Sequence, residues 1–526
     1  MKLKNKKIGA AIFTFAILAF LALGFLLNKK LLDTPVKELS QGKIKFGEFV
    51  DDVEGAYKSG VAFKNDFVNI NGLFARATGR NHYNGVSRLK NGMLIYGEVP
   101  LADMSDSAQG LIEFNSYLNK NGIDYLYVQA PVKVDLQGKL LYEGTVAYGN
   151  QNADQLLGIL KENNVDCIDL RTDIAATPEL VEKYFFKTDH HWTPEGAFKA
   201  FEIVLNDLYE KYPDANIDLS LTDPDKWNVT EYQNCFLGSH GKRVGIFYAG
   251  VDDFLLYTPK FDTDMSMYIP KHKLYYSGTF DEAVAIHKDY LENKDLFNEN
   301  PYCVYIGGDY PIVHHRNQNA SSDLKVLILK DSFSLPFQSF MATAFKEVDV
   351  IDPRHFTDCT VAEYISVSKP DIVITLLNPS VFDFPQYYKN GTSNAEYHDK
   401  QTAENVIYQK GEVTIVAKPE NMYTYNVLKN GAKFNTKYKI SFDDVEFLAG
   451  DSKCITVALY NSETKQFACN YAFDIDYCRK NGGFEWTFVS PEKQEGNLQI
   501  LIYAGRHSQT GGNTVRFTNV TVTEYN

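Results

Sequence analysis

The sequence predicts an α/β domain built on a parallel sheet, followed along the chain by an all-β domain. Between about residues 100 and 380, short apolar segments of strand length alternate with segments of helical periodicity. Such alternation is typical of a parallel sheet with helices on both faces. After about Lys400 the helical periodicity ends, and alternating runs recur between clusters of Gly, Asn, Asp or Lys. We therefore place the α/β domain in residues 81–399 and the all-β domain in residues 400–526.

The amino end, Met1–Leu32, has the features of an uncleaved membrane anchor. Four lysines between Lys2 and Lys7 precede the apolar run Ile8–Leu27, which is about long enough to span a bilayer, and no Ala-x-Ala-like cleavage site follows. Positive charge ahead of the run favours an amino end inside the cell. We expect a single anchor in the cell membrane, a stalk leading into helices over residues 33–80, and the rest of the chain outside the cell.

The elements of the α/β domain follow from periodicity and turn signals. A hairpin is expected over Asn84–Val99, with its turn at Lys90-Asn91-Gly92. The apolar runs that we predict as strands are Tyr125–Ala130, Val165–Leu170, Val326–Leu329, Val348–Ile351 and Ile372–Leu377. The segments with helical spacing are residues 108–118, Ala153–Glu162, Pro194–Tyr209 and Pro336–Phe345.

Residues 212–322 interrupt this alternation and are rich in Tyr, Asp, Asn and Gly. We interpret them as an insertion over the carboxyl edge of the sheet. Its tyrosines are able to stack on sugar rings, although packing within the insertion is the simpler explanation for most of them. In the all-β domain, the runs that predict an antiparallel sandwich are Tyr438–Phe442, Ile455–Tyr460, Trp486–Val489, Leu498–Tyr503 and Val515–Val522.

Composition narrows the class of partner. The formal net charge is -14, which argues against a nucleic-acid partner, and 44% hydrophobic residues suffice for sizeable cores. The seven cysteines show neither metal-ligand spacing nor close pairing. Their odd number excludes a fully paired internal framework, so we expect mostly buried thiols.

The segment Lys325–Ser334 contains the first candidate for chemistry. Val326–Leu329 is a run suited to a strand buried on both faces, and it stops at Lys330-Asp331-Ser332, just before a predicted helix. A serine at such a strand-to-helix corner lies at the carboxyl edge of the sheet, where backbone N–H groups and the helix dipole are able to stabilise an oxyanion. The alternative is a serine that only caps the following helix.

The second candidate is Phe186–Pro194, which contains the run Asp189-His190-His191-Trp192 ahead of a helix start. Asp189 and His191 are two residues apart, so in extended chain they project to the same side. A carboxylate beside an imidazole fixes its tautomer and stabilises the imidazolium formed when it takes a serine proton. The alternatives are solvent-exposed histidines or part of a metal site. A set of three or four spaced metal ligands is not evident, so we expect no metal.

These two motifs, in this order, resemble the DHHW family of SGNH-like proteins. That family is similar to the periplasmic polysaccharide O-acetyltransferases that modify alginate. The resemblance spans roughly Gly85–Pro379. It implies a flavodoxin-like SGNH fold in which Asp189, His191 and Ser332 act together. The chain departs from the wider SGNH pattern at Lys330, where many esterases have glycine, and the oxyanion hole is not defined by the sequence.

Four further residues are candidates for contacts to substrate or to an oxyanion. Arg354 and Asn378 each follow a predicted strand, so they lie at the same sheet edge as Ser332. Arg354 is able to hold an acyl oxygen or a sugar, with a surface ion pair as the alternative. Asn378 stands where SGNH-type enzymes place an oxyanion asparagine, with an ordinary turn residue as the alternative. The other two candidates for contacts to substrate or to an oxyanion are Trp192 and Lys133.

The resemblance implies an extracytoplasmic polysaccharide O-acyltransferase that forms an acyl-Ser332 intermediate. The acyl group is expected to be acetyl, no cofactor is expected, and a membrane-bound O-acyltransferase is a possible source of the acetyl group. The carboxyl end resembles a jelly-roll carbohydrate-binding module, which fits a surface polysaccharide as substrate. Two alternatives stay open: a carbohydrate esterase, which shares the chemistry up to the acyl-enzyme, and a non-catalytic polysaccharide-binding scaffold.

Overall fold

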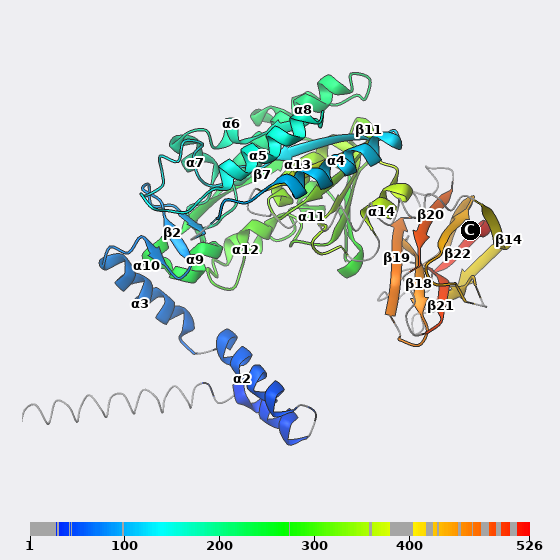
Figure 1. Cartoon of the computed structure of the whole chain (residues 1–526), viewed down its shortest axis with the longest axis horizontal. Coiled ribbons are helices and arrows are strands. Elements are labelled where there is room, and N and C mark those ends of the chain that lie inside the picture. The colour runs from blue at the N-terminus through cyan, green and yellow to red at the C-terminus, as the bar shows by residue number, and fades with distance from the viewer. Residues whose placement is uncertain are drawn as a thin grey trace, which may run out of the picture. The chain divides into compact units, whose positions relative to one another are not determined.

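The computed structural model of the chain describes residues 28–525 apart from 29–30, 42, 44, 61, 97–98, 273, 357–359, 379–402, 417–423, 429–430, 451–453, 465, 475–482, 491–495 and 505–512. The predicted anchor run Ile8–Leu27 lies outside the described residues. Within them, no helix is both long enough and apolar enough to cross a membrane. Figure 1 shows the elements in chain order.

The chain divides into two compact units, and the smaller one contains the described residues up to Asn84 together with Gly241–Gly250. Its elements are α2 (Phe46–Gly60), α3 (Lys64–Ala77), β1 (His82–Tyr83) and α10 (Ile246–Ala249). Helix α3 packs on α10, and the Asn69 side-chain oxygen accepts a hydrogen bond of 2.8 Å from the Ile246 N–H. Helices α2 and α3 lie in the segment 33–80, where a stalk leading into helices was expected.

The larger unit is built on a sheet whose described strands have the order β5-β4-β13-β11-β12-β10-β8-β9. Their bounds are β4 (Asp124–Gln129), β5 (Cys167–Asp169), β8 (Met265–Ile269), β9 (Leu274–Gly278), β10 (Ile312–Asn317), β11 (Ser322–Lys330), β12 (Phe345–Ile351) and β13 (Ile372–Leu377). From β5 to β12 neighbouring strands are parallel, whereas β10, β8 and β9 add on antiparallel. The predicted parallel sheet is therefore confirmed for the first five strands of this order, and the complete sheet is mixed.

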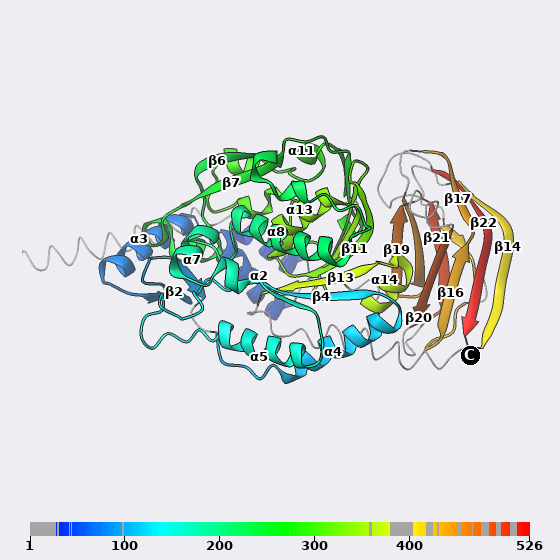
Figure 2. The same ribbon diagram turned by 90° about the horizontal axis from the view of Figure 1, so that it is seen from above.

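Helices cover both faces of this sheet (Figure 2). One face packs with α8 (Pro194–Lys211) and α13 (Ser334–Ala344), and the other with α4 (Ser105–Lys120), α5 (Gly149–Glu162) and α14 (Val361–Ser368). Every residue of α13 is buried, so this helix has no face exposed to solvent. The hairpin of this part is formed by β2 (Val86–Arg88) and β3 (Leu94–Tyr96), and its remaining helices are α6 (Arg171–Ile174) and α7 (Pro178–Tyr184). Helix α9 (Ser239–Val244) begins in this unit and ends in the smaller one.

The structure differs from expectation over residues 212–322. This segment does not form only a separate insertion, because β8, β9 and β10 extend the central sheet. Strand β10 was not predicted from the sequence. It contains His314, His315 and Arg316, so it lacks the apolar run that is typical of a buried strand. The other elements here are η1 (Leu219–Thr222), η2 (Pro224–Lys226), β6 (Trp227–Phe236), β7 (Asp252–Pro259), η3 (Pro270–His272), α11 (Phe280–Ala283), α12 (Asp289–Glu292) and η4 (Pro301–Val304).

The carboxyl-terminal part forms two antiparallel sheets, one with described strands β14-β22-β16-β20 and β17 beside β22, the other with β15-β21-β18-β19. Buried side chains from both sheets share one hydrophobic cluster, as expected for a sandwich. All five predicted strands are confirmed. The bounds are β14 (Glu404–Val416), β15 (Thr424–Asn426), β16 (Lys437–Phe442), β17 (Asp444–Ala449), β18 (Cys454–Asn461), β19 (Gln466–Asp474), β20 (Phe484–Val489), β21 (Leu498–Ala504) and β22 (Thr514–Tyr525).

Candidate active site

Ser332 lies in the short turn between β11 and α13, at the carboxyl edge of the central sheet. The side chain of Asp331 holds this turn in place. Its carboxylate accepts hydrogen bonds from the N–H of Phe333 at 2.9 Å and from the N–H of Asn378 at 2.7 Å. Burial raises the pKa of Asp331, although both N–H groups act in the opposite direction. The serine is thus placed on a rigid corner, as the sequence predicted.

The Asp-His-His-Trp motif lies in the loop that leads into α8. Thr193 caps the helix by accepting a hydrogen bond from the N–H of Gly196 at 3.2 Å, and Pro194 occupies the first turn. Phe185 and Trp192 form an antiparallel bridge across the base of the loop. This closed loop fixes the backbone of the residues between them.

The structure brings Asp189, His191 and Ser332 into one hydrogen-bonded chain. Asp189 Oδ1 lies 2.6 Å from His191 Nδ1, and His191 Nε2 lies 2.8 Å from Ser332 Oγ. Because an ionised carboxylate only accepts hydrogen bonds, Nδ1 carries the proton, and Nε2 of the neutral imidazole is left to accept the serine proton. These are the contacts that a serine nucleophile and its general base require.

Asp189 is buried and remains ionised because its environment compensates the charge. Its Oδ1 also accepts a hydrogen bond from the His191 N–H at 3.0 Å, and its Oδ2 accepts one from the Ser239 N–H at 2.6 Å. Burial opposes ionisation, but the favourable interactions, with His191 the largest and smaller ones from His190 and His240, hold the pKa of Asp189 well below its ordinary value. The carboxylate is therefore available to orient the imidazole.

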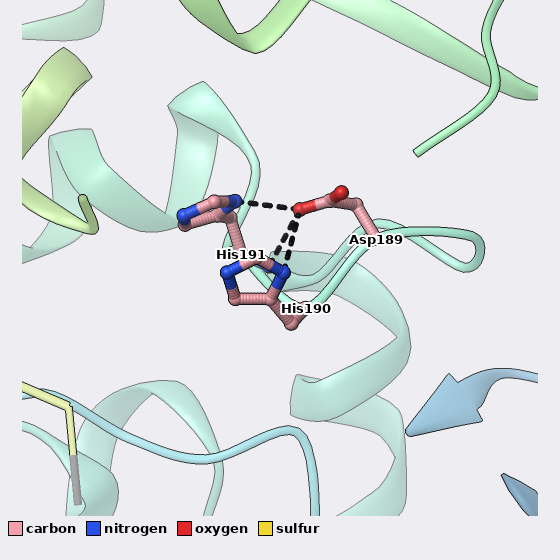
Figure 3. Close-up of side chains that lie close together, drawn as sticks. All are labelled: Asp189, His190 and His191. Atoms are coloured by element: carbon pink, nitrogen blue, oxygen red, sulfur yellow. Dashed lines mark hydrogen bonds and ion pairs between the residues drawn. The ribbon is translucent and has the colours of Figure 1, made fainter. Parts of the chain in front are cut away.

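His190 also points to the Asp189 carboxylate (Figure 3). Its Nδ1 lies 3.5 Å from Asp189 Oδ1 and 3.0 Å from Ser239 Oγ, and its ring packs on that of His191 at 3.8 Å between centroids. One ligand atom from each of these three motif residues lies within 4.8 Å of the others, a spacing that suits a metal ion. However, His191 Nδ1 donates its proton to Asp189, and its other nitrogen contacts Ser332, so the hydrogen-bonded arrangement favours serine chemistry.

Two aromatic side chains support the imidazole and the serine turn. Tyr302 stacks on His191 with 3.9 Å between ring centroids and 12° between planes. The Tyr302 hydroxyl and the Trp192 Nε1–H both donate to the Phe333 carbonyl, at 3.0 Å and 2.8 Å. Trp192, predicted as a substrate contact, is fully buried and acts here on the backbone beside Ser332. Tyr302 was missed by the sequence analysis.

Comparison with known proteins gives one family match. Residues 97–218 match the family model described as "SGNH hydrolase-like domain, acetyltransferase AlgX". Over these residues the chain is similar to the SGNH hydrolase-like domains that this model describes. This match confirms the resemblance stated from the two motifs, and it supports an acyltransferase.

Solved structures similar to the chain include three bacterial proteins. PatB1 of Bacillus cereus with a sulfonyl adduct is 22% identical, with 57% of this chain and 98% of that chain covered and a TM-score of 0.49. A DHHW family protein from Eubacterium siraeum is 19% identical, with coverage of 59% and 96% and a TM-score of 0.44. AlgX of Pseudomonas aeruginosa is 10% identical, with coverage of 84% and 94% and a TM-score of 0.35. No curated protein matches the sequence.

Lys133 contacts the backbone of the loop that contains the Asp-His-His-Trp motif. Its buried ammonium donates to the carbonyl oxygens of Phe186 at 3.0 Å, Lys187 at 3.2 Å and Asp189 at 2.5 Å. Burial lowers the pKa of Lys133 to about 7, although Asp252 and Asp189 act in the opposite direction. All three of its protons are engaged with the loop, which makes Lys133 a positioning residue in this structure.

Arg354 lies in a cluster of ion pairs with Asp352 and Asp309. Its guanidinium donates two hydrogen bonds to Asp352, of 2.9 Å and 2.5 Å, and one to Asp309, of 2.9 Å. The buried Lys330 pairs with the same two carboxylates. Asp309, Asp352 and His355 are also spaced suitably for a metal ion, but both carboxylates already have cationic partners. The arginine therefore compensates buried charge here.

Asn378 lies beside the serine turn, as predicted. Its N–H bonds to Asp331, and its Nδ2 donates to the Pro131 carbonyl at 2.9 Å. It also lines a cavity of about 60 Å³. Lys133 and His190 line the same cavity, whereas Arg354 and Trp192 are not among its described lining residues.

Gly238 is a position at which the domain tolerates no side chain. A Cβ there would lie 2.6 Å from both Cα and Oδ2 of Asp189. Gly238→Ala is expected to displace the carboxylate, lower ester turnover by about 10²-fold and destabilise the protein by about 1–3 kcal/mol. Turnover of a chromogenic acetyl ester and thermal unfolding measure the two effects.

The matched control is Gly158→Ala on α5, where a Cβ would meet nothing within 4 Å. That substitution is expected to leave turnover unchanged and to raise stability by about 0.5–1 kcal/mol. Equal turnover in both variants would show that the position of Asp189 does not depend on Gly238.

Proposed function

We propose that the chain is an extracytoplasmic polysaccharide O-acetyltransferase that works through an acyl-Ser332 intermediate. The observation that carries this proposal is the continuous hydrogen-bonded chain from Asp189 through His191 to Ser332, in a domain that matches an acetyltransferase family model. A capping serine would not require a buried imidazole and carboxylate aligned behind its hydroxyl.

In the first half-reaction, Ser332 Oγ attacks the carbonyl carbon of the acyl donor while its proton passes to His191 Nε2. The imidazolium is stabilised by Asp189. As the bond between the acyl carbon and the leaving oxygen of the donor breaks, His191 returns the proton to that oxygen. The positive end of α13, which begins at Ser334, favours the negative charge that develops on the acyl oxygen.

In the second half-reaction, a sugar hydroxyl loses its proton to His191 Nε2 and attacks the acyl carbon. The ester bond to Ser332 breaks, and the serine oxygen takes the proton back from the imidazolium. Atoms and charge balance without a metal or cofactor in these steps. If water replaces the sugar, the same residues hydrolyse the acyl-enzyme, so the acceptor alone separates transferase from esterase.

The experiment that tests the function offers the purified chain a chromogenic acetyl ester with and without oligosaccharides and determines the masses of the sugar products. Acetylated oligosaccharide is expected. Free acetate alone would identify an esterase, and no release of chromophore would leave a binding scaffold as the remaining reading.

The placement of the protein and its partners belongs to the same proposal. An uncleaved anchor over Ile8–Leu27 would hold the catalytic part outside the membrane, next to a surface polysaccharide. A membrane-bound O-acyltransferase would supply the acetyl group, and the carboxyl-terminal sandwich, as a jelly-roll module, would bind the polymer. Release from membranes by salt, without detergent, would contradict the anchor.

A further inference from the structure

The cavity of about 60 Å³ beside the triad has a chemically divided lining. One part is formed by aliphatic or small residues: Ile95, Val99, Val132, Val134, Ala147 and Gly149. A polar part is formed by side chains that include His190 and Asn378. The described lining of the cavity therefore combines an apolar part with a polar and aromatic part.

The polar part lies next to the nucleophile. Phe333, which follows Ser332 in the chain, lines the cavity, and Asn378 bonds through its N–H to Asp331, which precedes Ser332. His190 lines it as well and packs on the catalytic imidazole. The cavity therefore lies next to residues that adjoin Ser332 in the chain and in the fold.

The apolar part selects for hydrocarbon. A sugar ring placed against Ile95, Val132 and Val134 would bury hydroxyl groups without partners, at a cost of about 1–3 kcal/mol for each. An alkyl chain there gains about 0.8 kcal/mol for each buried CH₂ group. Apolar burial therefore favours the acyl moiety over the acceptor as the occupant.

The size of the cavity limits the length of that chain. One water-sized position needs about 10–15 Å³ on this measure, so about 60 Å³ holds roughly four to six such positions. An acyl group of two to four carbons fills this space, and a longer chain would extend beyond it.

We propose that this cavity is the acyl pocket, and that Ile95, Val132 and Gly149 set its preference for acyl groups of two to four carbons. The proposal rests on the proposed function, because it concerns the acyl group carried by Ser332. The sugar acceptor approaches from outside this pocket.

The test measures kcat/KM of the full chain for p-nitrophenyl acetate, butyrate, hexanoate and octanoate. The wild-type value is expected to fall at least tenfold between butyrate and octanoate. Val132→Ala and Ile95→Ala widen the pocket and are expected to raise the hexanoate-to-acetate ratio by about tenfold, since one or two methylenes in a pocket change discrimination by about 10–200-fold.

Two further variants give the opposite direction and a control. In Gly149→Ala, the added Cβ would lie 2.9 Å from Val132 Cγ1, so the pocket narrows and the butyrate-to-acetate ratio is expected to fall. Val146→Ala is the matched control, because Val146 is 37% exposed and lies outside the described lining. Its chain-length preference is expected to equal that of the wild type.

Thermal unfolding verifies that each variant is folded. Two widening variants are used, so that one still tests the pocket if the other does not fold. If both turn over the acetate ester but keep the wild-type chain-length preference, the pocket assignment is overturned and the proposed function stands. If the mass of wild-type Ser332 peptides never increases by an acyl group with any ester, the proposed function fails, and the pocket assignment fails with it.

Discussion

Ser332→Ala, His191→Ala and Asp189→Asn are each expected to lower turnover of a chromogenic acetyl ester by roughly 10³–10⁶-fold. Ser332→Ala removes the only atom able to form the acyl-enzyme. His191→Ala removes the base that lies 2.8 Å from that atom. In Asp189→Asn, the amide nitrogen disfavours the tautomer that accepts the serine proton. Because the three groups act as a unit, a double variant is expected to lose little more than the worse single one.

His190→Ala is the control within the same motif. His190 contacts Asp189 and Ser239 but not Ser332, so its removal is expected to lower turnover by a much smaller factor. Steady-state kinetics on the purified variants measure both effects. The assignment would be wrong if His190→Ala were the crippling change and His191→Ala were harmless.

The triad was predictable from sequence because each of its parts depends on short-range structure. Asp189 and His191 share one tight loop ahead of a capped helix, and both the cap and the proline were visible in the sequence. Ser332 follows an apolar strand of recognisable length. Only the meeting of the two segments, 141 residues apart, required the fold. The order of the parallel strands brings the two segments together at one edge of the sheet.

The supporting residues were not predictable, because their positions depend on distant parts of the chain. Tyr302 and Ser239 lie in a segment without clear periodicity, and no local pattern connects either of them to the motif. Lys330 is the one residue whose sequence position did indicate buried partners. A lysine at the end of a buried strand needs carboxylate partners, and the structure supplies Asp352 and Asp309, which also engage Arg354. The expected substrate role of Arg354 stays a prediction.

Asp349→Asn is expected to lower the free energy of unfolding by about 3–5 kcal/mol at pH 7. The Asp349 carboxylate accepts hydrogen bonds from His314 at 2.9 Å, Arg316 at 2.8 Å and Tyr364 at 2.6 Å. These contacts join β10, β12 and α14, so they attach the antiparallel part of the sheet to its parallel part. An asparagine removes the carboxylate charge that lies 2.8 Å from the nearly buried Arg316 guanidinium.

The control is Asp323→Asn, also an Asp-to-Asn change in this sheet. Asp323 pairs with Lys346 at 2.7 Å, but its side chain is 80% exposed. Exposed pairs contribute about 0–1 kcal/mol, so the midpoint of urea unfolding is expected to stay close to that of the wild type. A similar small change for Asp349→Asn would show that the buried network contributes little.

The pH dependence separates loss of this charge from a general packing defect. Burial opposes ionisation of Asp349, but Arg316 and His314 outweigh it and hold its pKa below the ordinary value of 3.8. A carboxyl whose pKa is lowered by folding stabilises the protein above its unfolded pKa, and this contribution is lost as the pH falls through the folded pKa. The wild type is therefore expected to lose stability below about pH 4, by up to about 1.4 kcal/mol per pH unit from this group, whereas the variant lacks that part of the slope. The free-energy gap between wild type and Asp349→Asn should narrow between pH 4 and pH 2 in urea titrations, and a gap that stayed constant over this range would assign the loss to packing.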